Sequence, residues 1–484
     1  MRTRNSRRRA LAPGLALLAA LSLAGTAAAK DLVGVFQDAL QADPVIRQAN
    51  ANRLAAREAR PQAWSAVLPQ VNGTVGQTRD HSSGFQDQIV QLTPTSPVTV
   101  VPYGVVAGTT SDQWALNLKQ NIFSWANWVA LKQAGSEVAQ AEATYAAAEQ
   151  DLILRVSQAY FNVLTAEASV EANESSLEAF SQQLDQANTR FAVGLVALTD
   201  VQEAKAAHDQ AAAATIAAKR TLATAEDQLQ EITGQKYDSL QKPGDDMPLK
   251  SPEPANEDRW VQISLDQNLS LIASRLAADI ARDNVRIAFG GHVPTIDLLA
   301  GRSYLKSDAN ETLDGFNFPN FDSKNNDRQI TLQLTVPIFS GGYTESKVRE
   351  AQYRWIAAKE GVVQSSRATE RQARDAYLGV ISGIAHVQAL RQALSSDQTA
   401  VQATEAGYEV GTRVAVDVLN ARKTLVQGQT DYASARYDYI VSILQLRLAA
   451  GNLDRAQLDE INSWLTVRAS TSPSVAPPPT PPGS

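Results

Sequence analysis

Cysteine is absent from this chain of 484 residues, and histidine occurs only four times. Without cysteine the chain can form neither a disulfide framework nor a Cys-based metal site. The histidines are dispersed, without the spacing of metal ligands, so we expect surface or packing roles for His81, His208, His292 and His386. The catalytic patterns G-x-S-x-G and H-E-x-x-H are also missing. We therefore expect no cofactor, no bound metal and no enzymatic activity.

Long apolar runs are missing as well. No stretch of about 20 apolar residues occurs, so the sequence predicts no transmembrane helix. Residues 1–29 have the features of a secretory signal peptide: Met1–Arg9 carries five arginines and no acid, Leu11–Ala24 is apolar, and Ala27-Ala28-Ala29 offers a cleavage site. A retained amphipathic anchor is the alternative. We therefore expect export from a bacterial-type cytoplasm.

The net charge is negative. The chain carries 44 basic and 51 acidic residues, a net charge of −7. Removing the five arginines of the signal peptide would give −12 (−7 minus 5). An acidic secreted protein is a poor candidate for binding nucleic acid, although acids that line a lumen would favour cations. The last segment, 469–484, is rich in Ser, Thr and Pro, and we expect it to be disordered.

The two halves of the chain share landmarks in the same order. Arg190–Val201 matches Gly407–Val418 at an offset of 217 residues, which aligns a Val-Gly pair and an aspartate from each half. Ile122-Phe123-Ser124 matches Ile338-Phe339-Ser340 at an offset of 216. Chance similarity between two Ala-rich helices would not preserve Gly, Asp and Phe together. The sequence therefore predicts an internal duplication.

Each half is predicted to contain a helix, two strands, a very long helix and a shorter returning helix. We expect the long helices at Ser124 to about Phe191 and at about Gly342 to Tyr408, each roughly 100 Å long at about 1.5 Å per residue. Such lengths are typical of coiled coils. Val138, Tyr145 and Leu152 lie seven residues apart, as along a packing seam. A long amphipathic helix in a soluble bundle is the alternative.

The shorter helices supply a matching length. We expect the first helix of each half at Asp31 to about Ala66 and about Asn256 to Phe289, and the returning helices at about Ala197 to Ile232 and Val414 to Ala450. A returning helix spans only about half of a long helix. Two short helices stacked end to end would therefore match one long helix.

Four segments alternate between apolar and polar residues, as strands with one apolar face do. The expected strands are Val71–Gln77, Asp112–Lys119, Thr295–Ser303 and Arg328–Val336. The polar segments between partners, 78–111 and 304–327, are expected to be exposed loops. The same alternation suits a barrel wall. Four strands cannot close a membrane barrel without leaving unpaired edges in lipid, whereas three chains would supply 12 strands.

At this point the residues resemble the TolC family of outer-membrane efflux and secretion ducts. The most specific stretch is Gly407–Leu419; Val336–Gly342 and Ala435–Tyr439 are also family-like, and the resemblance covers nearly all of Lys30 to Leu465. It implies a mixed fold, with a long α-helical coiled-coil barrel and a transmembrane β-barrel. It further implies a homotrimer with four strands per subunit in a 12-stranded barrel, surrounded by outer-membrane lipid.

The resemblance also implies the partners and the function. Family members meet a periplasmic adaptor (membrane fusion protein) and an inner-membrane transporter, in a tripartite efflux pump or a type I secretion system. We therefore expect a passive trans-periplasmic conduit in the outer membrane of a Gram-negative bacterium, gated at its periplasmic tip. A periplasmic coiled-coil adaptor or scaffold is the alternative, although adaptors usually have one helical hairpin rather than two. A secreted enzyme is a more distant third.

The expected organisation follows the two halves. The segments are a signal peptide (1–29), a first repeat (30–243), an inter-repeat linker (244–255), a second repeat (256–451), a C-terminal segment (452–468) and a Pro-rich tail (469–484). The resemblance places the linker and the C-terminal segment in the equatorial region of the tunnel.

The resemblance places the Val-Gly turns at the periplasmic tip, where the tunnel narrows. Asp417 matches the position whose side chains ring the narrowest point, and three aspartates around an axis would bind cations. Family members often carry a second acid three residues later. Here that position is Asn420, so cation affinity is expected to be lower than usual.

The resemblance also implies polar links that hold the tip closed. The matching residues are Tyr408 and Arg413 on one hairpin, and Thr199 and Asp200 on the other. The guanidinium fork of arginine can hold a carboxylate and a hydroxyl together. Each solvated link would contribute only about 0–1 kcal/mol, so a partner could break several. The alternative is that all four are ordinary polar residues of helix surfaces.

The turns themselves are expected to dock the adaptor. Glycine suits both positions because it accepts a positive φ after a helix end. The predicted docking residues are Val193, Gly194, Leu195, Val410, Gly411 and Thr412.

Overall fold

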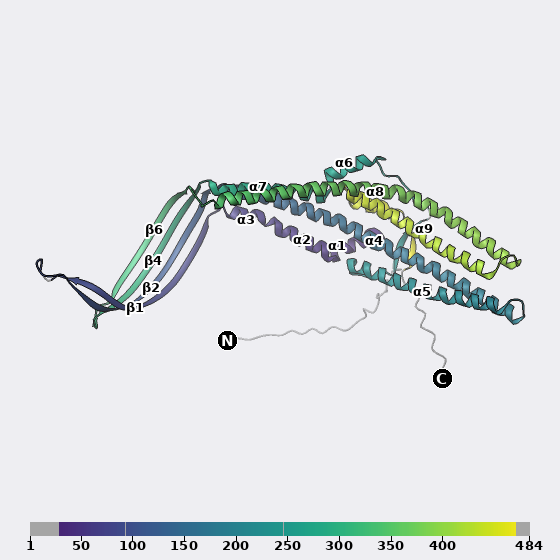
Figure 1. Ribbon diagram of the computed structural model, residues 1–484, viewed down its shortest axis with the longest axis horizontal. Helices are drawn as coiled ribbons and strands as arrows, with labels where there is room; N and C mark the ends of the chain where they lie inside the picture. The colour runs from purple at the N-terminus through teal and green to yellow at the C-terminus, as the bar shows by residue number, and fades with distance from the viewer. Residues whose placement is uncertain (1–28, 92, 245, 471–484) are drawn as a thin grey trace, which may run out of the picture.

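The structure is a computed structural model that describes residues 29–91, 93–244 and 246–470. The molecule is elongated, with an antiparallel sheet at one end and two helical hairpins that reach their turns at the other end (Figure 1). The signal peptide predicted for 1–29 lies outside the described residues except for Ala29. Of the predicted disordered tail, 469–484, the first two residues are strand and pair with Leu240 and Ser239, which corrects the prediction there. Residues 471–484 lie outside the described residues, so the rest of the tail and the signal peptide stay untested.

The long helices occur where the sequence predicts them. Helix α4 (Trp125–Ala192) has 68 residues and α8 (Tyr343–Glu409) has 67. The returning helices are α5 (Leu198–Thr233) and α9 (Ala415–Ala449). The expected bounds are confirmed to within one or two residues. Among the described residues, no helix is both long enough and apolar enough to cross a membrane.

The first helix of each half is broken, which corrects the prediction of one continuous helix. The segments are α1 (Leu32–Ala42), α2 (Pro44–Arg57), α3 (Ala59–Ser65), α6 (Glu257–Gln267), α7 (Leu269–Phe289) and the 3-10 turn η1 (Gly290–His292). Asp43 is extended (ψ 122°) and its carboxylate accepts a hydrogen bond from the N–H of Ile46 at 3.1 Å. Pro44 disfavours helical backbone in the residue before it, which explains this break. Asn268 caps α7 in the same way.

Matching helices of the two halves lie about 220 residues apart along the chain. Helix α6 begins and ends 225 residues after α1, as the pairs Leu32 and Glu257, and Ala42 and Gln267, show. Helix α9 begins 217 residues after α5, at Ala415. The same order of elements therefore occurs twice along the described chain.

The sheet is antiparallel, in the order β1-β2-β4-β6, with the short β5 pairing the far end of β4. Its strands are β1 (Gln70–Val90), β2 (Thr99–Phe123), β4 (Thr295–Leu313), β5 (Phe316–Asn317) and β6 (Phe321–Thr335). The strands are much longer than predicted, and most of 78–111 and 304–327 is strand rather than loop. The backbone ladder continues where side-chain alternation stops. In β2, for example, Val100 and Val101 are adjacent, as are Val105 and Val106, so each pair places one valine on each face.

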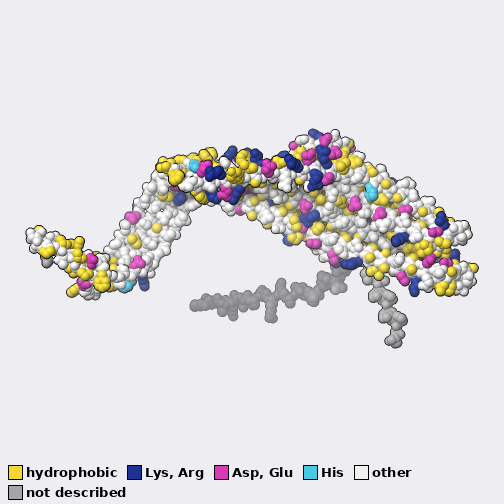
Figure 2. All heavy atoms as spheres, in the orientation of Figure 1, with side chains coloured by type: hydrophobic (Ala, Val, Ile, Leu, Met, Phe, Trp, Pro, Cys, Tyr) yellow, Lys and Arg dark blue, Asp and Glu magenta, His cyan; other side chains and the backbone are white. Residues whose placement is uncertain are grey.

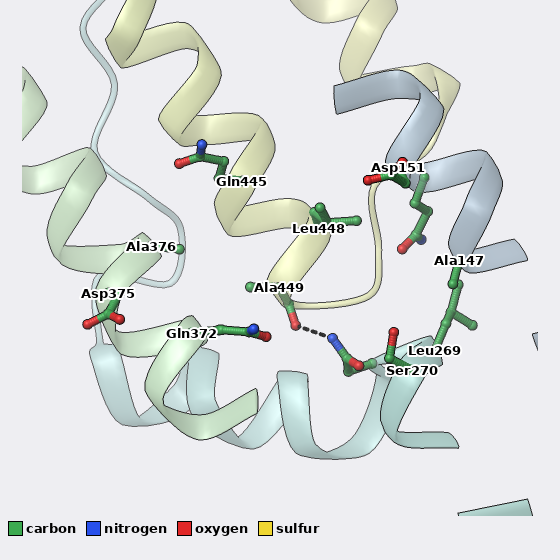
Figure 3. Close-up of a pocket in the computed structure, with 12 residues that line it drawn as sticks. Ala147, Asp151, Leu269, Ser270, Gln372, Asp375, Ala376, Gln445, Leu448 and Ala449 are labelled. Carbon is green, nitrogen blue, oxygen red and sulfur yellow. Dashed lines mark hydrogen bonds between the residues drawn. The ribbon is translucent and has the colours of Figure 1, made fainter. Parts of the chain in front are cut away.

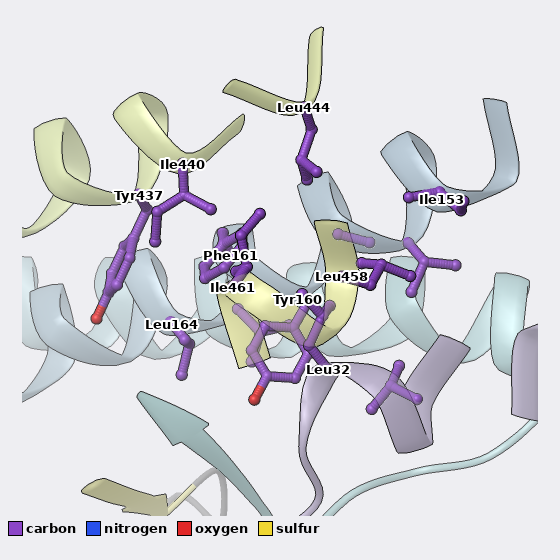
Figure 4. Close-up of a cluster of buried hydrophobic side chains, with 14 of the residues drawn as sticks. Leu32, Ile153, Tyr160, Phe161, Leu164, Tyr437, Ile440, Leu444, Leu458 and Ile461 are labelled. Carbon is purple, nitrogen blue, oxygen red and sulfur yellow. The ribbon is translucent and has the colours of Figure 1, made fainter. Parts of the chain in front are cut away.

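The largest hydrophobic core of the described residues lies around the middle of α4, from Leu152 to Val170, and Figure 4 draws part of it. Tyr160 and Leu164 of α4 meet Ile440 of α9 and Leu458 of α10 (Arg455–Asn462), all buried. Each buried leucine or isoleucine side chain contributes about 1.5–3 kcal/mol. A two-stranded sheet of β3 (Ser239–Pro243) and β7 (Leu465–Ser470) lies beside this core, and the Tyr160 hydroxyl donates to the carbonyl of Gln241 at 2.6 Å.

The break between α6 and α7 is fastened to the end of α9. The side-chain amide of Asn268 donates to the carbonyl of Ala449 at 3.1 Å (Figure 3). Beside this bond lies a cavity of about 430 Å³, lined by residues of α4, α7, α8 and α9. Gln150 of α4 donates to the carbonyl of Gly451 at 2.9 Å. Two segments far apart in sequence therefore fix one end of α9.

Gly451 is expected to tolerate no side chain. Its φ is +72°, and a Cβ would lie 2.8 Å from Cα of Asn268 and closer still to the carbonyl of Gln267. Gly451→Ala should cost more than the roughly 1–2 kcal/mol of a left-handed residue, because the facing backbone must also move. Thermal unfolding should show a lower midpoint than for Gly341→Ala, whose site has φ +64° and open space. Equal midpoints for the two variants would contradict this packing.

Candidate functional site at the hairpin tips

Each helical hairpin ends in a glycine turn of the Schellman type. At the first tip, Gly194 has φ +77° and the N–H of Leu195 donates to the carbonyl of Arg190 at 2.9 Å. At the second tip, Gly411 has φ +78° and the next N–H makes the equivalent bond at 2.8 Å. These six-to-one bonds satisfy carbonyls at the helix ends. The turns that the sequence predicts are therefore present at both positions.

The second turn holds its chain more firmly than the first. The hydroxyl of Thr412 donates to the carbonyl of Gly407 at 3.0 Å. The N–H of Arg413 donates to the same carbonyl at 3.1 Å. Three donors thus meet one carbonyl, counting the N–H of Thr412.

Apolar side chains at both tips point into solvent. Val193, Leu195 and Val410 are 67%, 74% and 75% exposed. Figure 2 shows hydrophobic side chains on the outer ends of both hairpins. Exposed apolar residues gathered at one end of a molecule mark a contact surface more often than scattered ones do.

The acids predicted at the tip lie in the first turns of the returning helices. Asp200 is the third residue of α5 and Asp417 the third residue of α9, where the helix dipole favours negative charge. Nη1 of Arg413 lies 3.6 Å from a carboxylate oxygen of Asp417. Asn420 lies one turn further along, exposed, and its carbonyl accepts from the hydroxyl of Thr424 at 3.1 Å.

The structure of one chain does not bring the four predicted link residues together. Arg413 pairs with Asp417 in its own hairpin. No hydrogen bond or ion pair between described residues joins Arg413 or Tyr408 to Thr199 or Asp200, and Thr199 is exposed. The closed-state link between hairpins therefore stays a prediction.

A contact between the hairpins that the sequence did not predict involves Arg190. Its guanidinium carbon lies 5.5 Å from the ring centre of Tyr408. A cation–π contact at an exposed site contributes about 0.5–1 kcal/mol. Within the second hairpin, Arg422 of α9 holds Glu405 of α8 at 2.6 Å. Spacing along the chain gives no sign of the Arg190 contact, since it depends on the hairpins lying side by side.

A groove separates the two hairpins on the side of the tips that faces the middle of the molecule. Its cavity of about 470 Å³ lies between α4, α5 and α9, and Phe180, Ala207 and Leu419 contribute apolar surface. Asn420 and Lys423 contribute the polar side. Asn420 therefore lies on the wall of this groove. Among the described residues, no group of three or more His, Asp or Glu side chains could hold a metal ion.

Comparison with known proteins gives a consistent result. The outer membrane efflux protein family matches residues 35–235 and 260–452. Outer membrane protein TolC of Escherichia coli (strain K12) is 34% identical over 473 residues, covering 96% of this chain and 92% of that protein. Alkaline protease secretion protein AprF of Pseudomonas aeruginosa is 26% identical over 441 residues, covering 91% and 88%.

A solved structure agrees with the fold. Outer membrane protein VceC of Vibrio cholerae aligns with a TM-score of 0.66 at 22% identity, covering 87% of this chain and 96% of that one. The family match covers both hairpins and both strand pairs, and the alignment with TolC covers nearly the whole of both chains. The chain therefore belongs to the outer membrane efflux protein family and is an exit duct of the outer membrane.

Proposed function

We propose that three copies of the chain form one passive conduit, with a 12-stranded barrel in the outer membrane and a coiled-coil tunnel in the periplasm. The repeated order of helices supports an internal duplication, in which the two halves of the chain derive from one ancestral unit. The conduit performs no catalysis and takes its energy from its partners. These are a periplasmic adaptor and an inner-membrane transporter, in efflux or type I secretion.

The two faces of the sheet carry this proposal. Pairing across the strands assigns every residue to one face. The face that we call the apolar face contains Val71, Trp114, Leu116, Leu118, Ile330, Leu332 and Leu334. The opposite, polar face contains Asn72, Thr74, Gln113, Asn117, Gln329, Thr331 and Gln333. A barrel wall with lipid outside and water inside has this alternation.

The apolar face has no cover in the single chain. Ile330, Leu332 and Leu334 are 82%, 70% and 62% exposed. The side of the sheet that is turned toward the viewer in Figure 2 shows few hydrophobic or charged side chains, so the two sides differ in character. The edges of β1 and β6 carry unpaired backbone groups, which lipid does not tolerate. Pairing β6 of one copy with β1 of the next, three times, removes both edges.

Outer-membrane fractionation tests the proposal directly. The full chain should migrate as a heat-resistant trimer from outer-membrane extracts and should form ion-conducting channels in planar bilayers. A soluble periplasmic monomer or dimer would instead support an adaptor or scaffold.

The tip supplies the gate in this proposal, with Asp417 as its cation-binding ring. Asp417→Asn should weaken the block of channel current by Mg²⁺ about ten-fold, because three carboxylates around one axis bind cations. Asn420→Asp should strengthen the block by restoring a second acid one turn away. Current block in planar bilayers measures both effects.

The matched control for this gate is Asp266→Asn, since Asp266 lies in α6, in the middle of the molecule (Figure 1). This variant should keep the wild-type block. If Asp417→Asn and Asp266→Asn behaved alike, Asp417 would not line the constriction.

A further inference from the structure

Two pairs of like charges face each other on the apolar face of the sheet. Arg302 of β4 lies directly opposite Arg328 of β6, and Lys306 lies directly opposite Lys324 four residues further from the helices. Directly opposed like charges destabilise a strand pair. Four cations thus share one small area of two strands.

The surroundings leave part of this charge unbalanced. Lys306 holds Asp308 at 2.7 Å and lies directly opposite Asp112 of β2. The next row places Asp308 opposite Asp322, so three carboxylates accompany the two lysines. Within the described chain, neither Arg302 nor Arg328 has a carboxylate at ion-pair distance. Arg302 instead lies with its guanidinium carbon 5.9 Å from the ring centre of Trp114.

The height of these residues in the membrane follows from the strands. The strand ends that lead to helices all lie at one end of the sheet, which the proposed function places on the periplasmic side. Strand residues further from the helices therefore lie nearer the outer leaflet. Trp114 and Tyr304 stack with ring centres 6.5 Å apart, in the row between the arginine and lysine pairs. Such aromatic residues mark the membrane–water interface. The apolar residues Ile330, Leu332 and Leu334 lie between this row and the helices, so the aromatic pair and the cations lie at the outer of the two interfaces, at the headgroup level of the outer leaflet.

From this arrangement we infer that Arg302, Arg328, Lys306 and Lys324 form a binding site for the phosphate groups of the phosphorylated glycolipid of the outer leaflet. Arginine binds phosphate through two parallel N–H donors. Long basic side chains can lift their charged ends to the interface while their stems contact acyl chains. One phosphate between opposed cations relieves their mutual repulsion. The inference rests on the proposed function, because that proposal turns the apolar face toward lipid.

The test is a titration of purified full-length trimer with bisphosphorylated lipid A and with its dephosphorylated form. The wild type should bind the phosphorylated form about ten-fold more tightly. The double variant Arg302→Gln/Arg328→Gln should lose most of this preference. Arg302→Lys/Arg328→Lys should retain most of it, because the charge remains, and this conservative variant separates charge from a folding defect.

The control on the opposite face is Lys119→Gln, which removes a cation from the polar face of β2. It should leave the preference unchanged. Equal binding of both lipids by wild type, an undiminished preference in the glutamine variant, or full displacement by inorganic phosphate would overturn the inference. If trimers form and conduct but show no preference, only this inference fails; if no outer-membrane trimer forms, the proposed function fails.

Discussion

Arg413→Ser is expected to raise single-channel conductance by loosening the closed tip. In the structure Arg413 is bound twice, through its backbone N–H to the carbonyl of Gly407 and through its guanidinium to Asp417. Serine keeps the backbone bond and removes the ion pair. That pair lies within one hairpin, so the loosening is expected from loss of the predicted link across the hairpins. A solvated link contributes about 0–1 kcal/mol per subunit, and three copies together would shift the open–closed balance by up to about 3 kcal/mol. Conductance in planar bilayers should rise several-fold if the shift in free energy is close to its upper value of about 3 kcal/mol.

Double variants identify the partner through which Arg413 acts. If Arg413 acts through its own hairpin, adding Arg413→Ser to Asp417→Asn should change conductance little more. If Arg413 acts across the hairpins, Arg413→Ser should instead add little to the effect of Asp200→Asn, because the two substitutions would remove the same link. The Tyr408 contact is tested by Arg190→Gln, which should have a smaller effect of the same sign, about 0.5–1 kcal/mol at most. An unchanged conductance in Arg413→Ser would exclude this gate.

Gly194→Val is expected to abolish export while leaving trimers intact. Gly194 has φ +77° and open space around it. A β-branched side chain in this conformation is strained by at least about 1–2 kcal/mol, which reshapes the turn that presents Val193 and Leu195. This cost is small beside a total stability of about 5–15 kcal/mol for a domain. Sensitivity to exported drugs and the amount of secreted protein should both show loss of function.

The matched control is Gly315→Val. Gly315 has φ +85°, nothing within 4 Å and a place in the turn between β4 and β5, at the opposite end of the molecule. It carries the same conformational strain without touching the tips. Export that persists in Gly194→Val, or fails equally in Gly315→Val, would reject docking at the first turn.

The helices could be predicted from the sequence because length and glycine position are local properties. The start of α4 follows from Ser124, whose hydroxyl caps this helix, and the end of α8 follows from the Gly411 turn. The break at Asp43 also has a local signal, an aspartate followed by proline. The break at Asn268 had no proline, so only its capping bond in the structure reveals it.

The strand lengths and the tip contacts could not be predicted in the same way. Alternation identifies a strand only where one face is apolar, as from Ile330 to Leu334, and it vanishes beyond Asp112 in β2 although the ladder continues to Thr99. The Arg190–Tyr408 contact joins residues far apart in sequence. It depends on how two hairpins lie together, which no local pattern encodes.

Closure of the barrel by three copies is the claim on which the account depends most, and cysteine cross-linking tests it. The chain has no cysteine of its own, so introduced pairs report only on the chosen positions. Thr74→Cys on β1 can be combined in turn with Gln329→Cys, Thr331→Cys and Gln333→Cys on β6, all on the polar face. In outer membranes at least one pair should oxidise to covalent dimers and trimers and to nothing larger. A chain that cross-links to no neighbour, or that gives an open ladder beyond three, would contradict the account.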